Sequence, residues 1–201
     1  CREAKPGSTQ EMTYGHGAAA LLLGEGNTIA DILSVESVHE DLIDQYRTVD
    51  TKYDYSLEER WVREEGWLKI VPDAINLALS KAEIQISDVD KVIVQGSAGA
   101  ARSLSKKIGI DGGKLADSLQ ATVGDCGAAH PLLMLSQVLA ESNPNEIIMI
   151  VGFGQGTDII LLKTNDLIMK KNTKKGLQIH LDNKRQIDNY TLYLSLRGHI
   201  D

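Results

Sequence analysis

Apolar runs that end in glycine or charged residues recur along the chain, and their lengths predict strands. A continuous apolar run of about four to eight residues, bounded by turn signals, is typical of a strand buried on both faces. We expect strands near residues 17–24, 29–37, 91–95, 147–152 and 157–163. They are predicted to form one mixed sheet.

Helical patterns lie between the predicted strands. The first helix is indicated by apolar residues every three to four positions, at Val71, Ile75, Leu79 and Ala82. Further helices are expected over Ala100 to Ile108 and over Ala128 to Glu141, the second broken by Asn143-Pro144-Asn145. The alternation of strands and helices predicts an α/β fold in which helices cover the sheet.

Two stretches differ from this alternation. Residues 50–67 are rich in charge, and we interpret them as an exposed excursion that leads into a helix. After Lys163 the chain becomes basic and weakly apolar, with the cation pairs Lys170-Lys171, Lys174-Lys175 and Lys184-Arg185. We therefore predict a domain over residues 1–163 and a basic linker or docking extension over residues 164–201.

Composition narrows the class of protein. With 42% hydrophobic and 24% charged residues, the 201-residue chain has the balance of a globular domain. No apolar run approaches the roughly 18 to 20 residues of a membrane-spanning helix, so we expect no membrane association. A net charge of -7 argues against nucleic acid as a partner, because such binding depends on a basic surface.

The two cysteines, Cys1 and Cys126, are too few for a disulfide framework and lack metal-ligand spacing. We therefore expect a cytoplasmic protein without a metal site. Because Cys1 is not an initiator Met, we also expect the chain to begin inside a longer one.

Five signatures follow one another along the chain. They are Tyr14-Gly15-His16-Gly17-Ala18-Ala19-Ala20, Ser105-Lys106-Lys107-Ile108-Gly109, Gly124-Asp125-Cys126-Gly127-Ala128-Ala129, Val151-Gly152-Phe153-Gly154-Gln155-Gly156, and Lys184-Arg185-Gln186 with Tyr190 to Leu194. In order and spacing they resemble the C-terminal half of the thiolase superfamily, in the branch of HMG-CoA synthase and ketoacyl-ACP synthase III. The last signature resembles the extension that joins this fold to a small OB-fold partner.

The resemblance implies a layered α/β fold built from two similar halves. A cysteine of the N-terminal half attacks an acyl thioester, since a thiolate is both a nucleophile and a good leaving group. The substrate would be acyl-CoA or an acyl carrier thioester, with no cofactor. The nucleophilic cysteine should lie upstream of this chain, and the implied partners are an N-terminal thiolase-like half, an OB-fold protein and further copies in a homo- or hetero-oligomer.

The chain departs from the family where the second half supplies a catalytic His and Asn. The loop Val94 to Gly99 contains no His, and Asp125 stands at the Asn position. We predict Asp125, Gln95 and Ser97 as catalytic residues, with Asp125 acting on a proton and the other two holding a carbonyl. The alternative for Asp125 is a cap on the helix that begins at Cys126.

The predicted substrate-binding residues are Gly154, Gln155, Gly156 and His130. The glycine-rich loop precedes a strand, so we expect close backbone approach to the acyl site rather than a phosphate cradle. His130 can also be a helix residue satisfied by a neighbour, and Cys126 is interpreted as a packing residue, with a reactive thiol as the alternative. Gln95, Ser97, Asp125 and Gln155 are expected to line one pocket, uncharged apart from Asp125.

Two functions follow from these observations. The first is the C-terminal domain of an HMG-CoA synthase-like acyltransferase that forms or cleaves C–C bonds. The second is a non-catalytic thiolase-like scaffold subunit, which pairs with an active homologue or an OB-fold partner and has lost its catalytic pair. Fold analogy alone does not decide between them.

Overall fold

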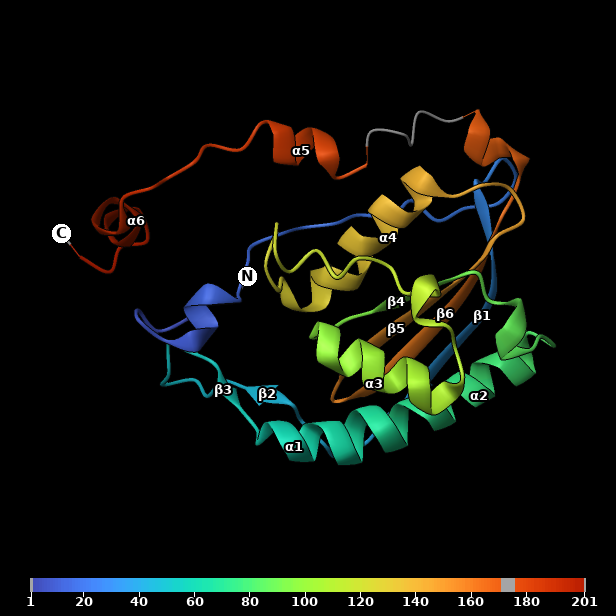
Figure 1. The fold of residues 1–201 in the computed structure, drawn as a ribbon, viewed down its shortest axis with the longest axis horizontal. Coiled ribbons are helices and arrows are strands. Elements are labelled where there is room, and N and C mark those ends of the chain that lie inside the picture. The colour runs from blue at the N-terminus through green and yellow to red at the C-terminus, as the bar shows by residue number, and fades with distance from the viewer. Residues whose placement is uncertain (1, 171–175, 201) are drawn as a thin grey trace.

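The computed structural model describes residues 2–170 and 176–200. Its centre is a four-stranded sheet in the order β1-β6-β5-β4 (Figure 1), with β1 at Ala30–Val38, β4 at Lys91–Val94, β5 at Ile147–Gly154 and β6 at Gly156–Thr164. β6 runs antiparallel to both β1 and β5, while β4 and β5 are parallel. Four of the five predicted strands, and the mixed sheet, are confirmed.

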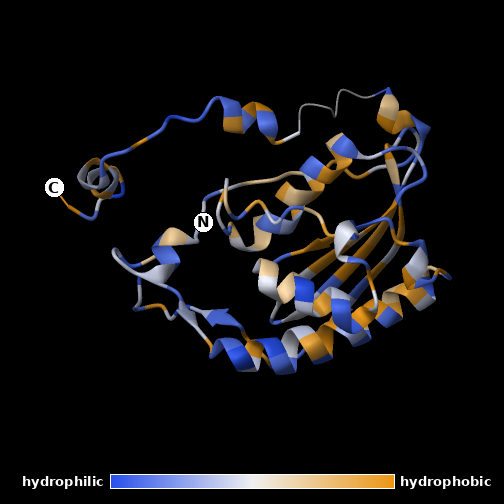
Figure 2. Cartoon of the chain, viewed as in Figure 1, coloured by the Kyte–Doolittle hydropathy of each residue, from blue (hydrophilic) through white to orange (hydrophobic). Residues whose placement is uncertain are grey.

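Helices cover both faces of this sheet and give three layers. α2 (Val71–Lys81) and α3 (Ala98–Ile108) lie on one face, and α4 (His130–Glu141) lies on the other. Because side chains alternate along a strand, Val151 packs under α2 and α3, whereas its neighbour Ile150 packs under α4. Hydrophobic residues accordingly concentrate on the strands in Figure 2. The predicted α/β class is correct.

The strand expected at residues 17–24 is absent, and that prediction is wrong. Residues 15–24 have no regular structure, and Leu22 is fully exposed. The start of the segment is held against the turn before α4, through a bridge between Tyr14 and Asp125 and the close approach of Gly15 to Val123. An apolar run becomes a strand only where a neighbouring strand takes up its backbone hydrogen bonds.

The charged stretch before α2 contains more structure than the sequence indicated. A two-stranded hairpin of β2 (Gln45–Tyr46) and β3 (Tyr55–Ser56) leads into α1 (Glu59–Trp61). The chain then continues as a nine-residue π-helix, η2 (Val62–Ile70), directly into α2. Short 3-10 turns complete the elements of this part of the chain: η1 at Thr9–Met12, η3 at Ile86–Asp88, η4 at Gly112–Lys114 and η5 at Gly127–Ala129.

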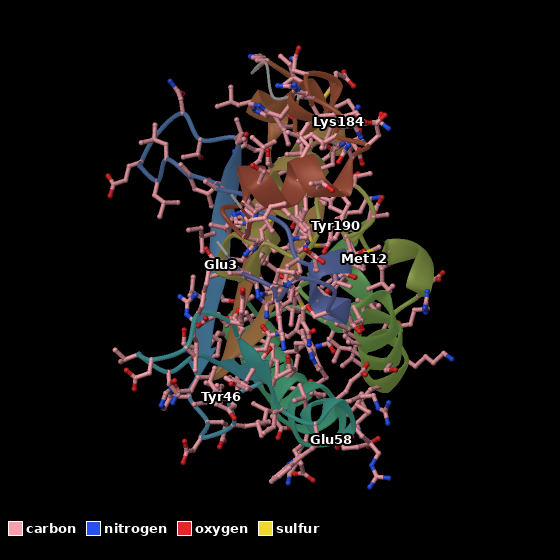
Figure 3. The ribbon with its side chains drawn as sticks, turned by 90° about the vertical axis from the view of Figure 1, so that its left-hand side faces the viewer. Glu3, Met12, Tyr46, Glu58, Lys184 and Tyr190 are labelled. Carbon is pink, nitrogen blue, oxygen red and sulfur yellow. The ribbon has the colours of Figure 1, made fainter. Side chains whose placement is uncertain are left out.

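The described part of the segment after Lys163 holds η6 (Asp166–Met169), α5 (Gln178–Asp182) and α6 (Tyr190–Leu196). α6 returns to the N-terminal segment, where the Tyr190 hydroxyl donates to Glu11 Oε2 at 2.9 Å, and Figure 3 shows Tyr190 beside Met12. Three lysines of the predicted basic extension, Lys171, Lys174 and Lys175, lie outside the described residues. The boundary near residue 163 stays a prediction. In the described part of the chain, no helix is both long and apolar enough to cross a bilayer.

Candidate functional site

The parallel pair β4 and β5 places two of the predicted catalytic residues at one edge of the sheet. Gln95 directly follows β4, and its N–H donates to the carbonyl of Val151 on β5 at 3.2 Å. Two residues on, Ser97 is the N-cap of α3, and its Oγ accepts from Ala100 N–H at 3.1 Å. In an α/β sheet, the carboxyl ends of parallel strands are where ligands bind.

Gly96 makes the sharp exit from β4 possible. Its φ of +132° is a conformation that L side chains rarely adopt, and a Cβ there would lie 3.0 Å from Trp67 Cζ2. Its carbonyl accepts from Gln120 Nε2 at 2.8 Å. The chain can therefore turn against the Trp67 ring, and Gln95 and Ser97 are held on either side of the turn.

The turn before α4 brings Asp125 next to Gln95. The Asp125 backbone is paired with the N-terminal segment, since its N–H donates to Thr13 O and its carbonyl accepts from Gly15 N–H. Asp125 Oδ1 accepts from Gly127 N–H at 2.8 Å, and Gln95 Nε2 donates to the Gly127 carbonyl at 3.1 Å. Both side chains are therefore bonded to one residue, and the expected convergence of Gln95 and Asp125 is confirmed.

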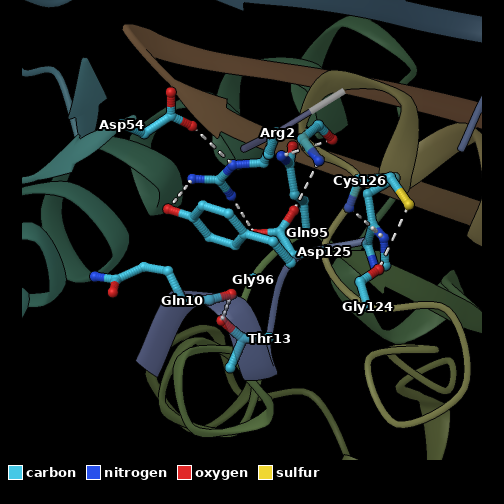
Figure 4. Close-up of polar contacts among 12 residues, drawn as sticks. Arg2, Gln10, Thr13, Asp54, Gln95, Gly96, Gly124, Asp125 and Cys126 are labelled. Carbon is cyan, nitrogen blue, oxygen red and sulfur yellow. Dashed lines mark hydrogen bonds and ion pairs between the residues drawn. The ribbon is translucent and has the colours of Figure 1, made fainter. Parts of the chain in front are cut away.

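The second oxygen of Asp125 is taken by Arg2, a residue that the sequence did not point to. Arg2 Nη1 donates to Asp125 Oδ2, Nη2 to the Tyr14 hydroxyl at 2.8 Å, and Nε to Asp54 Oδ2 at 3.4 Å (Figure 4). The guanidinium also lies 3.9 Å from the centre of the Tyr14 ring. With its side chain only 10% exposed, Arg2 forms a part-buried ion pair that neutralises Asp125. Asp125 accepts from the first N–H of η5, at Gly127, but the N-cap of η5 is Cys126, so Asp125 does not cap a helix that begins at Cys126.

A cavity of about 1310 Å³ opens in front of these groups, and its walls include Gln95, Ser97, Asp125 and Gln155. The expectation that one pocket unites these four residues is therefore confirmed. The expectation of an otherwise uncharged pocket is wrong, because the β2 and β3 hairpin, α1 and the N-terminal segment also contribute charges that the sequence pattern did not place there. The charged lining residues are Arg2, Asp44, Arg47, Asp54, Glu59, Arg63, Asp125 and Asp158.

Asp44, just before β2, is a lining residue with an altered proton affinity. Burial raises the pKa of its carboxyl above the ordinary aspartate value, the positive charge of Arg2 lowers it, and the carboxylate of Asp125 raises it further. The carbonyl of Asp44 accepts from Leu57 N–H at 2.8 Å, which fixes this residue to the hairpin. Nothing in its sequence surroundings distinguished Asp44 from the exposed acidic residues beside it.

The glycine-rich loop between β5 and β6 forms another wall of the cavity. Gly154, Gln155 and Gly156 all line it. Gly156 has a φ of +92°, and a Cβ there would lie 2.1 Å from the carbonyl of Val38. The close backbone approach that glycine permits at this position is thus to β1. Approach of the loop to an acyl group stays a prediction.

The structure does not bring His130 to the cavity. Its ring is fully buried, with Nε2 2.6 Å from the carbonyl of Ser118 and Nδ1 accepting from Cys126 N–H at 3.4 Å. Cys126 is 3% exposed, and burial together with the Asp125 carboxylate raises the pKa of its thiol. The interpretations of His130 as a satisfied helix residue and of Cys126 as a packing residue fit this geometry. Among the described residues, no group of three or more His, Cys, Asp or Glu side chains is arranged to hold a metal ion.

Sequence comparison matches the chain to one family model and to several curated proteins. The family model of the 3-oxoacyl-[acyl-carrier-protein (ACP)] synthase III C terminal matches residues 79–164. Hydroxymethylglutaryl-CoA synthase of Thermoplasma acidophilum is 27% identical over 98% of this chain and 58% of the relative, and that of Methanobrevibacter smithii is 28% identical with the same coverage. The chain therefore spans less than two thirds of the curated relatives that it matches.

Solved structures show the same fold. The 3-oxoacyl-[acyl-carrier-protein] synthase III from Aquifex aeolicus superposes with a TM-score of 0.61 and 18% identity, over 69% of this chain and 46% of that one. The 3-oxoacyl-(acyl carrier protein) synthase III from Pseudomonas aeruginosa superposes with a TM-score of 0.57 and 15% identity, over 67% and 44%. In both, the similarity covers less than half of the solved chain.

Proposed function

The chain is the C-terminal half of a thiolase-superfamily protein. On that premise, we propose that it is the C-terminal domain of an HMG-CoA synthase-like acyltransferase. The domain would act on acyl-CoA or acyl carrier thioesters in C–C bond formation or cleavage. The observation that carries the proposal is the convergence of Gln95, Ser97 and Asp125 on one large cavity at the carboxyl ends of β4 and β5. The similarity to hydroxymethylglutaryl-CoA synthases over 98% of the chain supports the same class of reaction.

The neutral side chains of the cavity suit a thioester carbonyl. An amide NH₂ has two hydrogens, and Gln95 Nε2 gives one of them to Gly127, so the other is available to a substrate oxygen. The Ser97 hydroxyl accepts a bond from Ala100 and can still donate its own hydrogen. Two such donors would stabilise the negative charge that develops on the carbonyl oxygen, in place of the family's His and Asn.

The nucleophile of this proposal is a cysteine upstream of this chain, within an N-terminal thiolase-like half. Cys126 is unsuited to the role, because its thiol is buried and its pKa is raised, and a nucleophilic thiol must ionise. An OB-fold partner and an oligomeric assembly also belong to the proposal, as does a cytoplasmic location in view of the cysteine usage.

Acyl transfer from acetyl-CoA by the full-length protein tests the function. We expect Gln95→Ala to lower turnover by about 10²- to 10³-fold, the usual effect of removing one donor to a developing oxyanion. Asn76→Ala, an exposed amide on α2 outside the cavity lining, is the matched control and should leave turnover unchanged. Turnover like that of the wild type in both Gln95→Ala and Asp125→Ala would remove these residues from the site.

One observation favours the scaffold alternative. Both carboxylate oxygens of Asp125 are already occupied, by Arg2 and by Gly127, and the loop from Val94 to Gly99 supplies no His. If the full-length wild-type protein turns over none of a set of short acyl-CoA thioesters, the scaffold function replaces the acyltransferase.

A further inference from the structure

The carboxyl groups that line the cavity differ in the ion pairs and hydrogen bonds that they form. Asp125 binds Arg2 and Gly127 through its two oxygens, and Asp54 faces Arg2 with one oxygen and Arg47 with the other. Asp44 lines the same cavity, yet among the described residues no side chain forms an ion pair or a hydrogen bond with its carboxyl. Glu59 and Asp158 also line the cavity and form no ion pair with the described residues, but both are exposed, whereas Asp44 is half-buried. Asp44 is therefore the half-buried carboxyl of this lining that can exchange a proton without first breaking an ion pair.

The position of Asp44 is fixed although its carboxyl is not tied to another side chain. The main chain is held beside β3 through the bond from Leu57 N–H to the Asp44 carbonyl. Two opposite charges face it across the cavity: the guanidinium of Arg2 from the N-terminal segment and the carboxylate of Asp125 from the turn before α4. Asp44 is thus a positioned, half-buried carboxyl in the wall of the cavity, and a general base must reach the proton of a bound substrate directly or through one water.

Burial is the main influence on this group, and it raises the pKa of Asp44 above the ordinary aspartate value. The proton affinity of a general base matters, because its efficiency is greatest when its pKa lies close to the operating pH. A raised pKa moves an aspartate in that direction.

We propose that Asp44 is the catalytic acid and base of the cavity, which takes the proton from the carbon next to a thioester carbonyl and later passes it to the leaving thiolate. This inference rests on the proposed function, since it needs an acyl thioester in the cavity. The residues that hold the carbonyl oxygen during this step are Gln95 and Ser97, and Arg2 balances the added negative charge.

The step is balanced within the cavity and needs no redox partner. The C–H bond breaks, its proton forms an O–H bond on Asp44, and its electron pair moves into the enolate of the thioester. When the enolate carbon attacks a second acyl thioester, a C–C bond forms and a thiolate leaves. The proton held by Asp44 then passes to that thiolate, which restores the carboxylate for another cycle.

Hydrogen exchange at the substrate carbon separates this inference from the proposed function. Acetyl-CoA is incubated with the full-length protein in D₂O, and deuterium in the acetyl methyl group is followed by mass spectrometry. We expect exchange in the wild type and a loss of about 10²- to 10⁴-fold in Asp44→Asn. Asp41→Asn, an exposed acidic neighbour outside the cavity lining, is the matched control and should exchange like the wild type.

A second measurement protects the test against a folding defect in the variant. Titration of the ¹³C-labelled aspartate carboxyls, with the Asp44 signal assigned by its loss in Asp44→Asn, should give a pKa above the ordinary value of 3.8. A value at or below 3.8 overturns the role of Asp44. Undiminished exchange in Asp44→Asn also overturns it and leaves the acyltransferase standing, whereas absence of exchange in the wild type overturns both.

Discussion

Arg2 is the residue on which the electrostatics of the cavity depend. Its guanidinium lies between Asp125 and Asp54, and all three side chains are largely buried, with exposures of 10, 19 and 16%. Charges in such a site are stable only when they are paired, because water no longer solvates them. Motif comparison could place Asp125 at a family position, but it could not reveal a partner 123 residues away in the sequence.

Removal of Arg2 should destabilise the fold. In Arg2→Ala, Asp125 is left as a buried and unpaired carboxylate, and we expect a loss of about 3 to 5 kcal/mol in the free energy of unfolding, measured with urea. Lys69→Ala, which breaks the exposed pair between Lys69 and Glu65, should leave this free energy nearly unchanged. A loss no larger in Arg2→Ala than in the control would show that the pair contributes nothing to stability.

A substitution at Gly66 is also expected to lower the stability of the fold. A Cβ at this position in η2 would lie 2.3 Å from Phe153 Cζ, and the Phe153 ring packs against Trp67 with 4.9 Å between their centres. We expect Gly66→Ala to lower the unfolding free energy by about 1 to 3 kcal/mol, through overpacking. Gly99→Ala in α3 is the control: its nearest neighbour is Ser97 Oγ at 3.6 Å, so it should be neutral or slightly stabilising. A neutral Gly66→Ala would disprove the close contact.

Among the elements, residues 15–24 are a segment in which the structure differs from what the hydrophobic pattern predicts. The apolar run predicted a strand, yet only the first residues are held, and Leu22 and Leu23 are 101% and 72% exposed. We expect the amides of residues 18–24 to exchange with solvent deuterium without protection, while those of β1 exchange slowly. Protection of residues 18–24 equal to that of β1 would mean that the segment is a paired strand after all.

The contact of α6 with the N-terminal segment is predicted to depend on pH. Arg197 Nη1 lies 2.8 Å from His16 Nε2, which can accept a hydrogen bond only while the imidazole is neutral. Burial, followed by the charge of Arg197, lowers the pKa of His16 below 6.5, with Glu3 acting in the opposite direction. Because the folded state binds the proton less well, the contact is complete above pH 6.5 and weakens as the pH falls through the lowered pKa.

Amide exchange of α6 measures this contact. Once corrected for intrinsic exchange rates, protection of Tyr190–Leu196 should decrease between about pH 7.5 and about pH 5 in the wild type. In His16→Gln, which keeps an acceptor but does not titrate, protection should be independent of pH. A decrease of the same size in His16→Gln would assign the effect to another group.

At the scale of the whole molecule, the sequence correctly predicted the strands that depend on local hydrophobic pattern. The strands at residues 91–95, 147–152 and 157–163 each contain a short continuous apolar run, and both partners of each pair lie within the chain, so pattern and structure agree. The convergence of Gln95 and Asp125 was predicted because a family resemblance carried tertiary information. Arg2, Asp44 and the hairpin charges were not predicted, because polar residues in irregular segments carry no periodic signal for the contacts they make.

The central claim is that this fold presents a cavity for an acyl thioester, and that the cysteine nucleophile lies upstream of this chain. Incubation of the full-length protein with acetyl-CoA, followed by proteolysis and mass spectrometry, tests it most directly. We predict an acetyl group on a cysteine upstream of Cys1, with Cys1 and Cys126 unmodified and with the same result in Cys126→Ser. Acetylation of Cys126, or no covalent acetyl group on any cysteine, would contradict the claim.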